Sequence, residues 1–495
     1  MVTGTTQSGA APNIAAGYSG REMSFTRRTL LVGAASGFSV LVLSACTDEA
    51  DAPTPTATPT ASVGSIPAEK MFHRSNWAND PYAYGATSYL AVGALPQSRE
   101  VLRQPVLDRV FLAGEAFSDD PGTIRGAIAS GRSAASLLAE AMEKGERVAV
   151  IGAGAAGAAA ARVLAASGAE VIVVEARDRT GGRVDSYVID DEASFELGAW
   201  RVLDDADDSM VEALAREGVD VVPLSGATAY ALQGETAIAE LNADDPAVLA
   251  AAASLESASV WAQQQLHDVP FAEALREGGG LGDWPAAAVG EVTSEAIAGQ
   301  LLLSASGLTG ADPAELSAWF STPALGLGSL VPTGPLSTFI DAALEDIDTV
   351  VSTVVVGVFY DESGVSLRLG TGEALSVDRV LVTVPLGVLQ QQLIEFDPPL
   401  PLAHRGALDA LSVGHIEVVR LEFETAFWNT EAVWWVHDDD VQQIRLWVNL
   451  LPATGRAVLL GVVGGQRALD LAEASDDDVR EAALRSLAPF VQSTP

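Results

Sequence analysis

One stretch of the sequence decides the fold of this chain: Val148-Ala149-Val150-Ile151-Gly152-Ala153-Gly154-Ala155-Ala156-Gly157. The β-branched run 147–151 predicts a buried parallel strand, and the alanine-rich run 158–166 predicts a helix directly after the glycines. In a turn of this kind Gly152 allows the tight bend, Gly154 lets a pyrophosphate approach the backbone, and Gly157 lets the helix pack closely on the strand. The stretch therefore predicts a dinucleotide-binding unit with the phosphates at the start of the helix.

A second predicted strand, 170–174, ends at Glu175, which lies 23 residues after Gly152. An acidic side chain at this distance accepts hydrogen bonds from the hydroxyl groups of the adenosine ribose. This fingerprint alone is compatible with both FAD and NAD.

The residues after this strand separate the two cofactors. Glu175-Ala176-Arg177 leads into Gly181-Gly182-Arg183, and the run 195–200 follows as Phe-Glu-Leu-Gly-Ala-Trp. Together with the glycine turn, these motifs resemble the flavin-containing amine oxidases, the family of the monoamine and polyamine oxidases, and their desaturase relatives. The resemblance extends over roughly residues 71–485. It implies an α/β fold in which an FAD-binding Rossmann-like (GxGxxG) domain is interleaved with an α+β substrate domain.

The resemblance also assigns residues to the cofactor. Arg177 and Arg183 are expected near the ribose, the pyrophosphate and the flavin, Gly198 and Ala199 beside the isoalloxazine ring, and the backbone of Val355 at the adenine. No metal site is expected. The residues expected to bind FAD are Gly114, Glu115, Thr123, Gly152, Gly154, Gly157, Glu175, Arg177, Gly182, Arg183, Gly198, Ala199, Trp200 and Val355.

The motif that closes the chain in this family stands here before the motif that opens it. Segments 110–116 and 121–127 resemble the closing flavin-binding motif, and they precede the opening motif at 148–157. Gly145 suits the short helix-to-strand turn between the two motifs, because glycine readily adopts a left-handed helix cap. The order is that of a circular permutation, which is tolerated when the termini of a compact domain lie close together. The alternative is an artefact of gene assembly, against which the intact leader and its natural-looking tether argue.

At 495 residues the chain exceeds the usual size of a single domain. We expect the FAD-binding domain to comprise residues 71–225 and 322–395, with the closing motif first. The substrate domain is expected to comprise 226–321, as helices, and 396–490, with an antiparallel sheet over about 396–460.

Residues 1–46 are predicted to be an export signal. The run around Arg27 and Arg28 resembles a twin-arginine signal, and the apolar run 30–43 is too short and too rich in glycine for a transmembrane helix. It ends in a sequence that resembles a bacterial lipobox, Leu-Ser-Ala-Cys, so Cys46, the only cysteine, is expected to carry lipid.

The Thr, Pro and Ala residues of 47–70 predict a disordered tether, because such a segment cannot bury enough surface to become ordered. Export by the twin-arginine route and a lipid anchor at the outer face of the bacterial cell membrane are therefore expected. The anchor would be the only contact with the membrane.

The formal net charge of −38 argues against nucleic-acid binding, since the neutralisation of phosphates needs a basic surface. Two explanations for the acidity stay open. It is a solvated surface typical of an acidic or salt-adapted proteome, or it steers cationic amines toward the protein.

The resemblance implies an active-site lysine that is hydrogen-bonded through water to flavin N5. The aligned position holds Val418, and the chain has only two lysines, Lys70 and Lys144. Arg420 shares the strand face of Val418, about 7 Å along the strand, and could hold a water while staying charged. The alternative role for Arg420 is that of an ion-paired residue. Glu417 is expected on the opposite face of the strand.

Other residues of the substrate half have structural roles as their first interpretation. His415 is more often a partly buried structural histidine than a base. Trp434, Trp435 and Trp447 are expected in the core, with cavity lining as the alternative.

Two further departures from the family bear on the flavin and the substrate. Ala86 stands where monoamine oxidases bond the flavin through a cysteine, so the FAD is expected to be non-covalent. The two tyrosines that enclose the amine in that subfamily correspond to Thr87 and Thr123, so a different amine site is expected.

The resemblance implies an FAD-dependent oxidoreductase that oxidises an amine, an amino acid or a polyamine by hydride transfer to flavin, with oxygen or another compound as the electron acceptor. Two alternatives stay open. One is a flavin-binding protein that has lost catalysis and serves as a scaffold, and the other is a desaturase-like flavin dehydrogenase with an acceptor other than oxygen.

Overall fold

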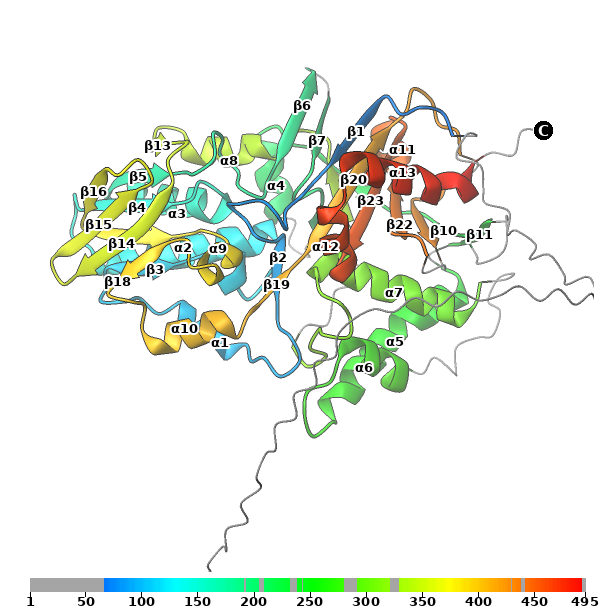
Figure 1. Cartoon of the computed structure of the whole chain (residues 1–495), viewed down its shortest axis with the longest axis horizontal. Coiled ribbons are helices and arrows are strands. Elements are labelled where there is room, and N and C mark those ends of the chain that lie inside the picture. The colour runs from blue at the N-terminus through cyan, green and yellow to red at the C-terminus, as the bar shows by residue number, and fades with distance from the viewer. Residues whose placement is uncertain are drawn as a thin grey trace, which may run out of the picture. The chain divides into compact units, whose positions relative to one another are not determined.

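The computed structural model describes residues 66–190, 193–203, 209–231, 238–242, 244–279, 292–320, 329–428, 430–437 and 441–491. The predicted leader with Cys46, and the predicted tether up to residue 65, lie outside these residues. The described chain forms two bodies, one built on a parallel sheet and one on a mainly antiparallel sheet, and the polypeptide passes between them several times (Figure 1).

Five strands form the parallel sheet of the first body. All four residues of one central strand, β17, are buried, because both faces of the sheet are covered by other layers. The strand of the closing motif pairs in parallel with β17 in the register Val110↔Val380, so both flavin motifs belong to one sheet. The strands in spatial order are β13 (Asp348–Val350), β5 (Glu170–Val174), β4 (Arg147–Ile151), β17 (Arg379–Val382) and β3 (Val110–Leu112).

Helices α2 (Ile124–Ala141), α3 (Ala155–Ala166) and α8 (Ser337–Leu344) cover one face of this sheet. Leu164 of α3 joins Val150 of the sheet in one buried cluster. The helix predicted after the glycine turn is therefore present, with α3 beginning three residues earlier than the alanine run suggested.

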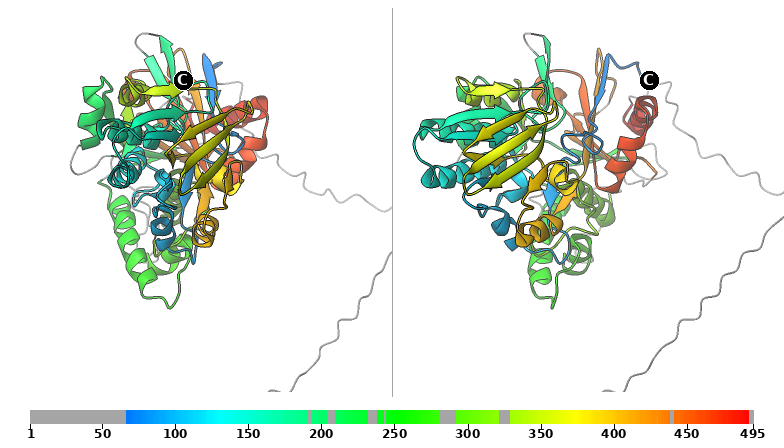
Figure 2. Two further views of the ribbon diagram at one scale, coloured as in Figure 1. Left: turned by 90° about the vertical axis from the view of Figure 1, so that its left-hand side faces the viewer. Right: turned by 60° about the vertical axis from the view of Figure 1, so that its left-hand side comes forward.

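A second, four-stranded sheet covers the opposite face (Figure 2). Val358 and Leu367 of this sheet pack with Val380 of the parallel sheet. The strands in spatial order are β16 (Ala374–Val377), β15 (Gly364–Leu369), β14 (Val355–Asp361) and β18 (Glu395–Asp397).

The second body is built on a seven-stranded sheet. Its first strand, β1, covers residues that the sequence placed in the FAD-binding half, yet it pairs antiparallel with β20 in the register Met71↔Glu422. The four residues of β1 do not by themselves indicate which sheet the strand joins, because the choice depends on a partner strand some 350 positions away in the sequence. The strands in spatial order are β1 (Met71–Arg74), β20 (Ile416–Glu422), β23 (Val458–Gly464), β22 (Leu446–Asn449), β21 (Trp434–His437), β10 (Thr228–Ala231) and β11 (Ile238–Leu241).

Helices pack on both sides of this sheet. On one side lie α5 (Pro246–Gln263) and α7 (Ser294–Thr309), with α6 (Phe271–Gly278) packed on α5, and on the other lie α12 (Gln466–Glu473) and α13 (Asp476–Leu487). Three small sheets are also described: β2 (Thr87–Tyr89) paired with β19 (Ser412–Gly414), β6 (Ser186–Asp190) paired with β7 (Ala193–Glu196), and the three strands β8 (Val202–Leu203), β12 (Ser329–Pro332) and β9 (Val221–Leu224). The other described helices are α1 (Gln97–Leu102), α4 (Ser209–Arg216), α9 (Leu386–Gln390), α10 (Leu402–Asp409), α11 (Leu451–Thr454) and the short 3-10 helices Glu115–Phe117 and Ala488–Phe490.

The first and last described residues lie on the same part of the second body. Ile66 packs against the cluster that contains Phe490, and Glu69 forms an ion pair with Arg480 of α13 at 3.0 Å. Residues 66–70, which the sequence assigned to the tether, therefore contact the folded chain.

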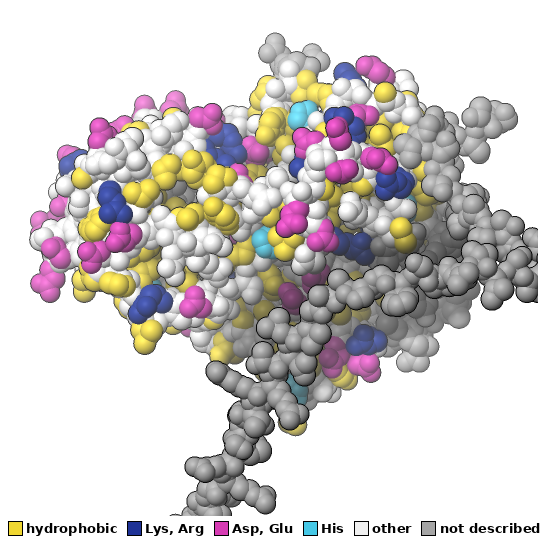
Figure 3. All heavy atoms as spheres, viewed as in Figure 1, with side chains coloured by type: hydrophobic (Ala, Val, Ile, Leu, Met, Phe, Trp, Pro, Cys, Tyr) yellow, Lys and Arg dark blue, Asp and Glu magenta, His cyan; other side chains and the backbone are white. Residues whose placement is uncertain are grey.

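On the face seen in Figure 3, acidic side chains are scattered rather than gathered at one place. Figure 3 shows Asp and Glu side chains spread across the viewed face, with Lys and Arg side chains between them. Within the described residues, no helix combines the length and apolar character needed to cross a membrane.

Candidate active site

A cavity of about 820 Å³ opens between the parallel sheet and the seven-stranded sheet. Its size falls in the range of cofactor and substrate sites. Of the residues predicted to bind FAD, all but Gly157 line it: Gly114, Glu115, Thr123, Gly152, Gly154, Glu175, Arg177, Gly182, Arg183, Gly198, Ala199, Trp200 and Val355.

The glycine turn presents backbone to this cavity. Gly152 has a φ of +107°, which permits the sharp bend after β4. Gly157 lies under the turn, where an added β-carbon would stand 1.9 Å from the carbonyl oxygen of Gly152. Helix α3 begins at Ala155 without a side-chain cap, so its first N–H groups stay available to an anion in the cavity.

Glu175 holds the turn and faces the cavity at the end of β5. One carboxylate oxygen accepts the backbone N–H of Ala153 at 2.7 Å, and the other accepts the N–H of Arg177 at 2.8 Å. Each oxygen can accept a second hydrogen bond, so the carboxylate can hold the turn and a ribose hydroxyl together.

Arg177 is fixed by a residue that the sequence did not predict as its partner. Its guanidinium forms a two-point ion pair with Asp80, at 2.7 and 2.8 Å. It also lies over the rings of Trp77 and Tyr82, 5.8 and 5.4 Å from their centres. The positive charge is therefore balanced and held at the cavity wall.

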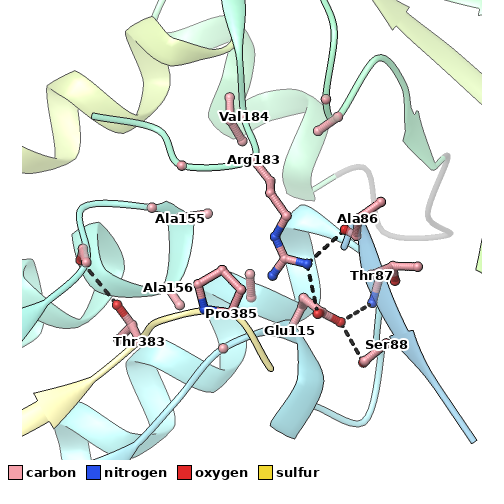
Figure 4. A pocket seen from close by; sticks show the side chains of 18 of the residues that line it. Ala86, Thr87, Ser88, Glu115, Ala155, Ala156, Arg183, Val184, Thr383 and Pro385 are labelled. Atoms are coloured by element: carbon pink, nitrogen blue, oxygen red, sulfur yellow. Dashed lines mark hydrogen bonds and ion pairs between the residues drawn. The ribbon is translucent and has the colours of Figure 1, made fainter. Parts of the chain in front are cut away.

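Arg183 and Glu115 join the two flavin motifs (Figure 4). The guanidinium Nη1 of Arg183 donates to the carbonyl oxygen of Ala86 at 2.8 Å and contacts Glu115 Oε1 at 3.2 Å. The other oxygen of Glu115 accepts from Ser88 Oγ at 2.8 Å and from the N–H of Gly122 at 2.9 Å. Because Glu115 is buried, this ion pair ties the closing motif to the Gly181-Gly182-Arg183 segment that follows the opening motif.

Two threonines border the same part of the cavity. Thr123 caps α2, where its Oγ1 accepts the N–H of Gly126 at 2.8 Å. Thr87 Oγ1 is buried and has no hydrogen-bond partner in the structure. A buried hydroxyl without a partner at a cavity wall points to a polar ligand group at this place.

Val418 lines the cavity, at the position where the resemblance implies a lysine. Neither lysine of the chain lies there: Lys70 is 3.8 Å from Glu422, and Lys144 packs against Gly168. No lysine Nζ therefore lies on the described cavity wall.

Arg420 does not line the cavity. Its guanidinium forms an ion pair with Glu422 at 2.8 Å and lies 4.3 Å from the centre of the Phe195 ring. The structure thus gives Arg420 the ion-paired role and does not bring it to the flavin side.

The other candidate residues on or near this strand have surroundings that fit a structural role. Trp435 and Trp447 are fully buried, and Trp434 packs against the core; none of them lines the cavity. Burial lowers the pKa of His415, which favours the neutral ring, and this residue is also absent from the cavity wall.

Glu417 faces away from the cavity, as strand alternation predicted. It is buried and accepts from Ser75 Oγ and from the N–H of Ala78, the latter at 3.0 Å. Burial raises the pKa of Glu417 to about 7. The folded chain therefore holds this proton more tightly than the unfolded chain does.

Because the pKa of Glu417 is higher in the folded chain than in the unfolded chain, the unfolding free energy depends on pH. The contribution of this carboxyl is complete below the unfolded pKa of 4.5 and is lost as the pH rises through about 7. We expect Glu417→Gln, which keeps the shape of the protonated group, to reduce the loss of unfolding free energy between about pH 5 and 8 by on the order of 3 kcal/mol. Urea unfolding at a series of pH values measures this. The exposed Glu362→Gln should leave the pH profile unchanged, and an unchanged profile in Glu417→Gln would contradict the assignment.

Arg201 is a cavity-wall residue that the sequence did not indicate. It follows Trp200, lies 5.2 Å from the centre of that indole ring, and donates from Nη1 to Ser329 Oγ at 3.3 Å. Burial lowers the pKa of Arg201 to about 10. No carboxylate among the described residues forms an ion pair with it.

The cavity wall fits FAD. It offers a helix N-terminus for phosphate, a carboxylate for ribose, two fixed arginines and a hydroxyl without a partner. The described parts of the chain hold no group of three His, Cys, Asp or Glu side chains that could bind a metal ion.

Comparisons with known proteins agree with this geometry. Residues 60–139 and 155–495 match the profile of the family described as flavin containing amine oxidoreductase. The chain is 27% identical to polyamine oxidase 4 of Oryza sativa subsp. japonica over 358 residues, which cover 67% of this chain and 70% of that protein.

Solved structures show the same fold. A variant of putrescine oxidase superposes with a TM-score of 0.55 at 21% identity, over 70% of this chain and 82% of the other. Cyclohexylamine oxidase from Brevibacterium oxydans IH-35A gives a TM-score of 0.55 at 20% identity, over 70% and 81%. The predicted α/β fold with an FAD-binding Rossmann-like domain is confirmed. The chain is an oxidoreductase of the family of flavin-containing amine oxidases.

Proposed function

We propose that this protein binds FAD non-covalently and oxidises a substrate at the carbon next to an amine nitrogen. The observation that carries the proposal is that one cavity has a wall that combines both flavin motifs with residues of the second body. When bound, FAD accepts the hydride, while the protein supplies binding, orientation and electrostatics.

The residues divide these tasks along the cavity. The first turn of α3 binds phosphate charge, and Glu175 binds ribose. The Arg183–Glu115 pair fixes the two motifs relative to each other. On the opposite side Val418, together with Ile416 and Phe320, gives an apolar wall that excludes water from the reacting carbon.

Turnover tests this proposal. Oxidation of an amine to an imine, followed by addition of water, releases ammonia and a carbonyl compound, while two electrons pass to the acceptor. We expect the purified protein to release ammonia from an amine or amino acid when either oxygen or a redox dye accepts these electrons. A flavin-loaded protein that releases none with any member of a broad panel would favour the scaffold alternative.

Non-covalent FAD is supported by Ala86, whose methyl group offers no atom for a thioether bond to the flavin. Acid precipitation should release all of the yellow colour into the supernatant, and colour retained in the pellet would contradict the proposal.

The contacts of Glu175 allow an estimate of how much its removal weakens FAD binding. Glu175→Ala should weaken FAD binding by on the order of 1–3 kcal/mol, because the ribose loses a charged acceptor and the N–H of Ala153 loses its partner. Titration of the apoprotein with FAD, followed by flavin fluorescence, measures this. Unchanged affinity would place the ribose elsewhere.

A second candidate, a flavin dehydrogenase that passes electrons to an acceptor other than oxygen, is favoured by Val418 at the lysine position. It predicts turnover with the redox dye but little with oxygen. The ratio of these two rates separates the candidates.

We also infer a circular permutation of the family's order. The contact between Glu69 and Arg480 supports it, because the ends that the family order would join lie side by side. A variant that begins at residue 144 and carries residues 66–143 behind residue 491, through a short flexible linker, should fold with the same flavin content. Failure to fold would count against the inference.

For the leader, we propose that Cys46 carries lipid and anchors the protein at the outer face of the cell membrane; the sequence pattern supports this. Cys46→Ser should release the protein from the membrane fraction, and Lys in place of Arg27 and Arg28 should block export. If the Cys46→Ser protein stays in the membrane fraction, the anchor lies elsewhere.

A further inference from the structure

Four arginines surround a second hollow, of about 500 Å³, on the helical side of the first body. We call it the arginine groove, after Arg125, Arg132, Arg162 and Arg216. Its volume falls in the range of small-molecule sites. None of the residues predicted to bind FAD lines it, so the nucleotide site does not account for it.

Helices α2 and α4 each turn one face toward the groove. The residues of α2 that line it are three or four positions apart from Arg125 to Arg132, and those of α4 follow the same spacing from Ser209 to Arg216. Residues three and four apart lie on the same side of a helix. The exposed arginines at the ends of these two faces therefore form the rim of the groove.

The floor of the groove is apolar. Ile128 of α2 and Met210 of α4 are buried there, and Phe339 of α8, which is partly buried, adds an aromatic ring. The space between the helices is open because several wall positions carry side chains that end at Cβ: Ala129, Ala213, Ala342 and Ala343. An apolar floor with a charged rim fits an organic anion better than an inorganic one.

The described lining of the groove has a charge opposite to that of the chain. The chain has 66 acidic and 28 basic residues, whereas this lining has four arginines and one acid, Glu217. A local field of this sign attracts anions to the groove even though the protein as a whole is acidic.

Two of the arginines have fixed partners. Arg162 donates to three carbonyl oxygens at the end of α8, at 2.9 to 3.0 Å, and Arg125 pairs with Asp120 at 2.8 Å. Among the described residues, Arg132 and Arg216 form no ion pair with an acid, and Arg216 Nε donates to a carbonyl oxygen of its own helix at 3.2 Å. Both side chains therefore keep N–H groups that a ligand can use.

We propose that the arginine groove is a second binding site, for a small organic anion with an apolar body and two carboxylates. A carboxylate fits the planar fork of N–H donors on a guanidinium, and Arg132 and Arg216 offer one such fork from each helix. The apolar body would lie on Ile128, Met210 and Phe339. This inference is independent of the proposed function, because no step of amine oxidation enters it.

Calorimetric titration of the FAD-saturated protein tests this site, with naphthalene-2,6-dicarboxylate as the probe. We expect one equivalent to bind, with a Kd that Arg132→Gln and Arg216→Gln each raise about fivefold, as for an exposed charge pair. Naphthalene-2-carboxylate, which has a single acid, should bind the wild type more weakly by a similar factor. Absence of binding to the wild type, or wild-type affinity in the double variant, would overturn the proposal.

The groove adjoins the FAD cavity, because Arg125 and Met210 line both. Saturation with FAD fills the nucleotide part of the cavity, and Arg201→Gln reports on the rest, since Arg201 lines the cavity and not the groove. We expect Arg201→Gln to bind the probe like the wild type. Release of FAD by the probe, or a Kd that rises in Arg201→Gln and not in Arg132→Gln, would place the probe in the cavity and contradict the assignment.

Arg405→Gln on α10 is the matched control, since it removes the same charge from an exposed position outside both hollows. Flavin content and melting temperature establish that each variant is folded. The Kd of Arg405→Gln should equal that of the wild type. A Kd raised as much as in Arg132→Gln would show that only the overall charge matters, and the site would be lost.

A last variant tests the acids of the chain itself. Four aspartates shortly precede Ser209 in the sequence and lie outside the described residues: Asp204, Asp205, Asp207 and Asp208. We expect the probe to bind with these four residues intact. Binding that requires all four to be changed to Asn would assign the groove to this acidic segment rather than to a separate ligand, and would overturn the proposal.

Discussion

Val418→Lys is expected to raise the rate at which oxygen reoxidises the reduced flavin by roughly a hundred- to a thousand-fold. A fixed cation beside the reacting flavin stabilises the negative charge that develops as oxygen takes up the first electron, and such preorganised charge is worth about 3–4 kcal/mol. In the wild type Val418 supplies no charge, and no lysine lies on the described wall. Hydride transfer from the substrate depends more on orientation and should change less.

Stopped-flow mixing of the substrate-reduced protein with oxygenated buffer measures this rate. Val418→Met is the control, because it adds similar bulk without charge and should reoxidise like the wild type. Wild-type reoxidation as fast as that of Val418→Lys would contradict the prediction. Slower reoxidation in Arg201→Gln would then identify Arg201 as the cation that serves oxygen.

Gly154→Ala is expected to weaken FAD binding by about 3 kcal/mol, or roughly a hundred-fold, while the apoprotein keeps its stability. An added β-carbon has room within the protein, since the nearest atom, the carbonyl oxygen of Gly181, would be 3.7 Å away. The new methyl group would instead occupy the space in which the pyrophosphate must approach the backbone.

Melting temperatures of the apoprotein and FAD titrations of the same samples separate these two effects. Gly299→Ala, the same change in α7 at a position with no atom within 4 Å of the new carbon, should alter neither quantity strongly. By contrast, Gly157→Ala should destabilise the fold itself, because its β-carbon would overlap the carbonyl oxygen of Gly152. Wild-type FAD affinity in Gly154→Ala would place the pyrophosphate elsewhere.

The parts of the structure that local sequence determines could be predicted. The glycine turn, β4, α3 and the acidic end of β5 form one continuous stretch whose residue types each have a local conformational reason. These elements led to the α/β fold and to the cavity wall.

The parts of the structure that depend on distant partners could not be predicted from the sequence. The pair of Arg177 and Asp80 joins positions 97 residues apart, and β1 finds its partner strand even farther along the chain. Arg201 stands out only because the described structure leaves it without an acid, a property that no single residue or spacing encodes.

The most direct test of the account is anaerobic titration of the purified holoprotein with a panel of amines and amino acids, followed by flavin absorbance. We predict that at least one member of the panel bleaches the flavin band completely, with one equivalent of carbonyl compound and one of ammonia formed for each flavin reduced. A flavin band that stays unchanged throughout the panel, in a protein with full FAD content, would contradict the claim that this chain is an active amine-oxidising flavoenzyme.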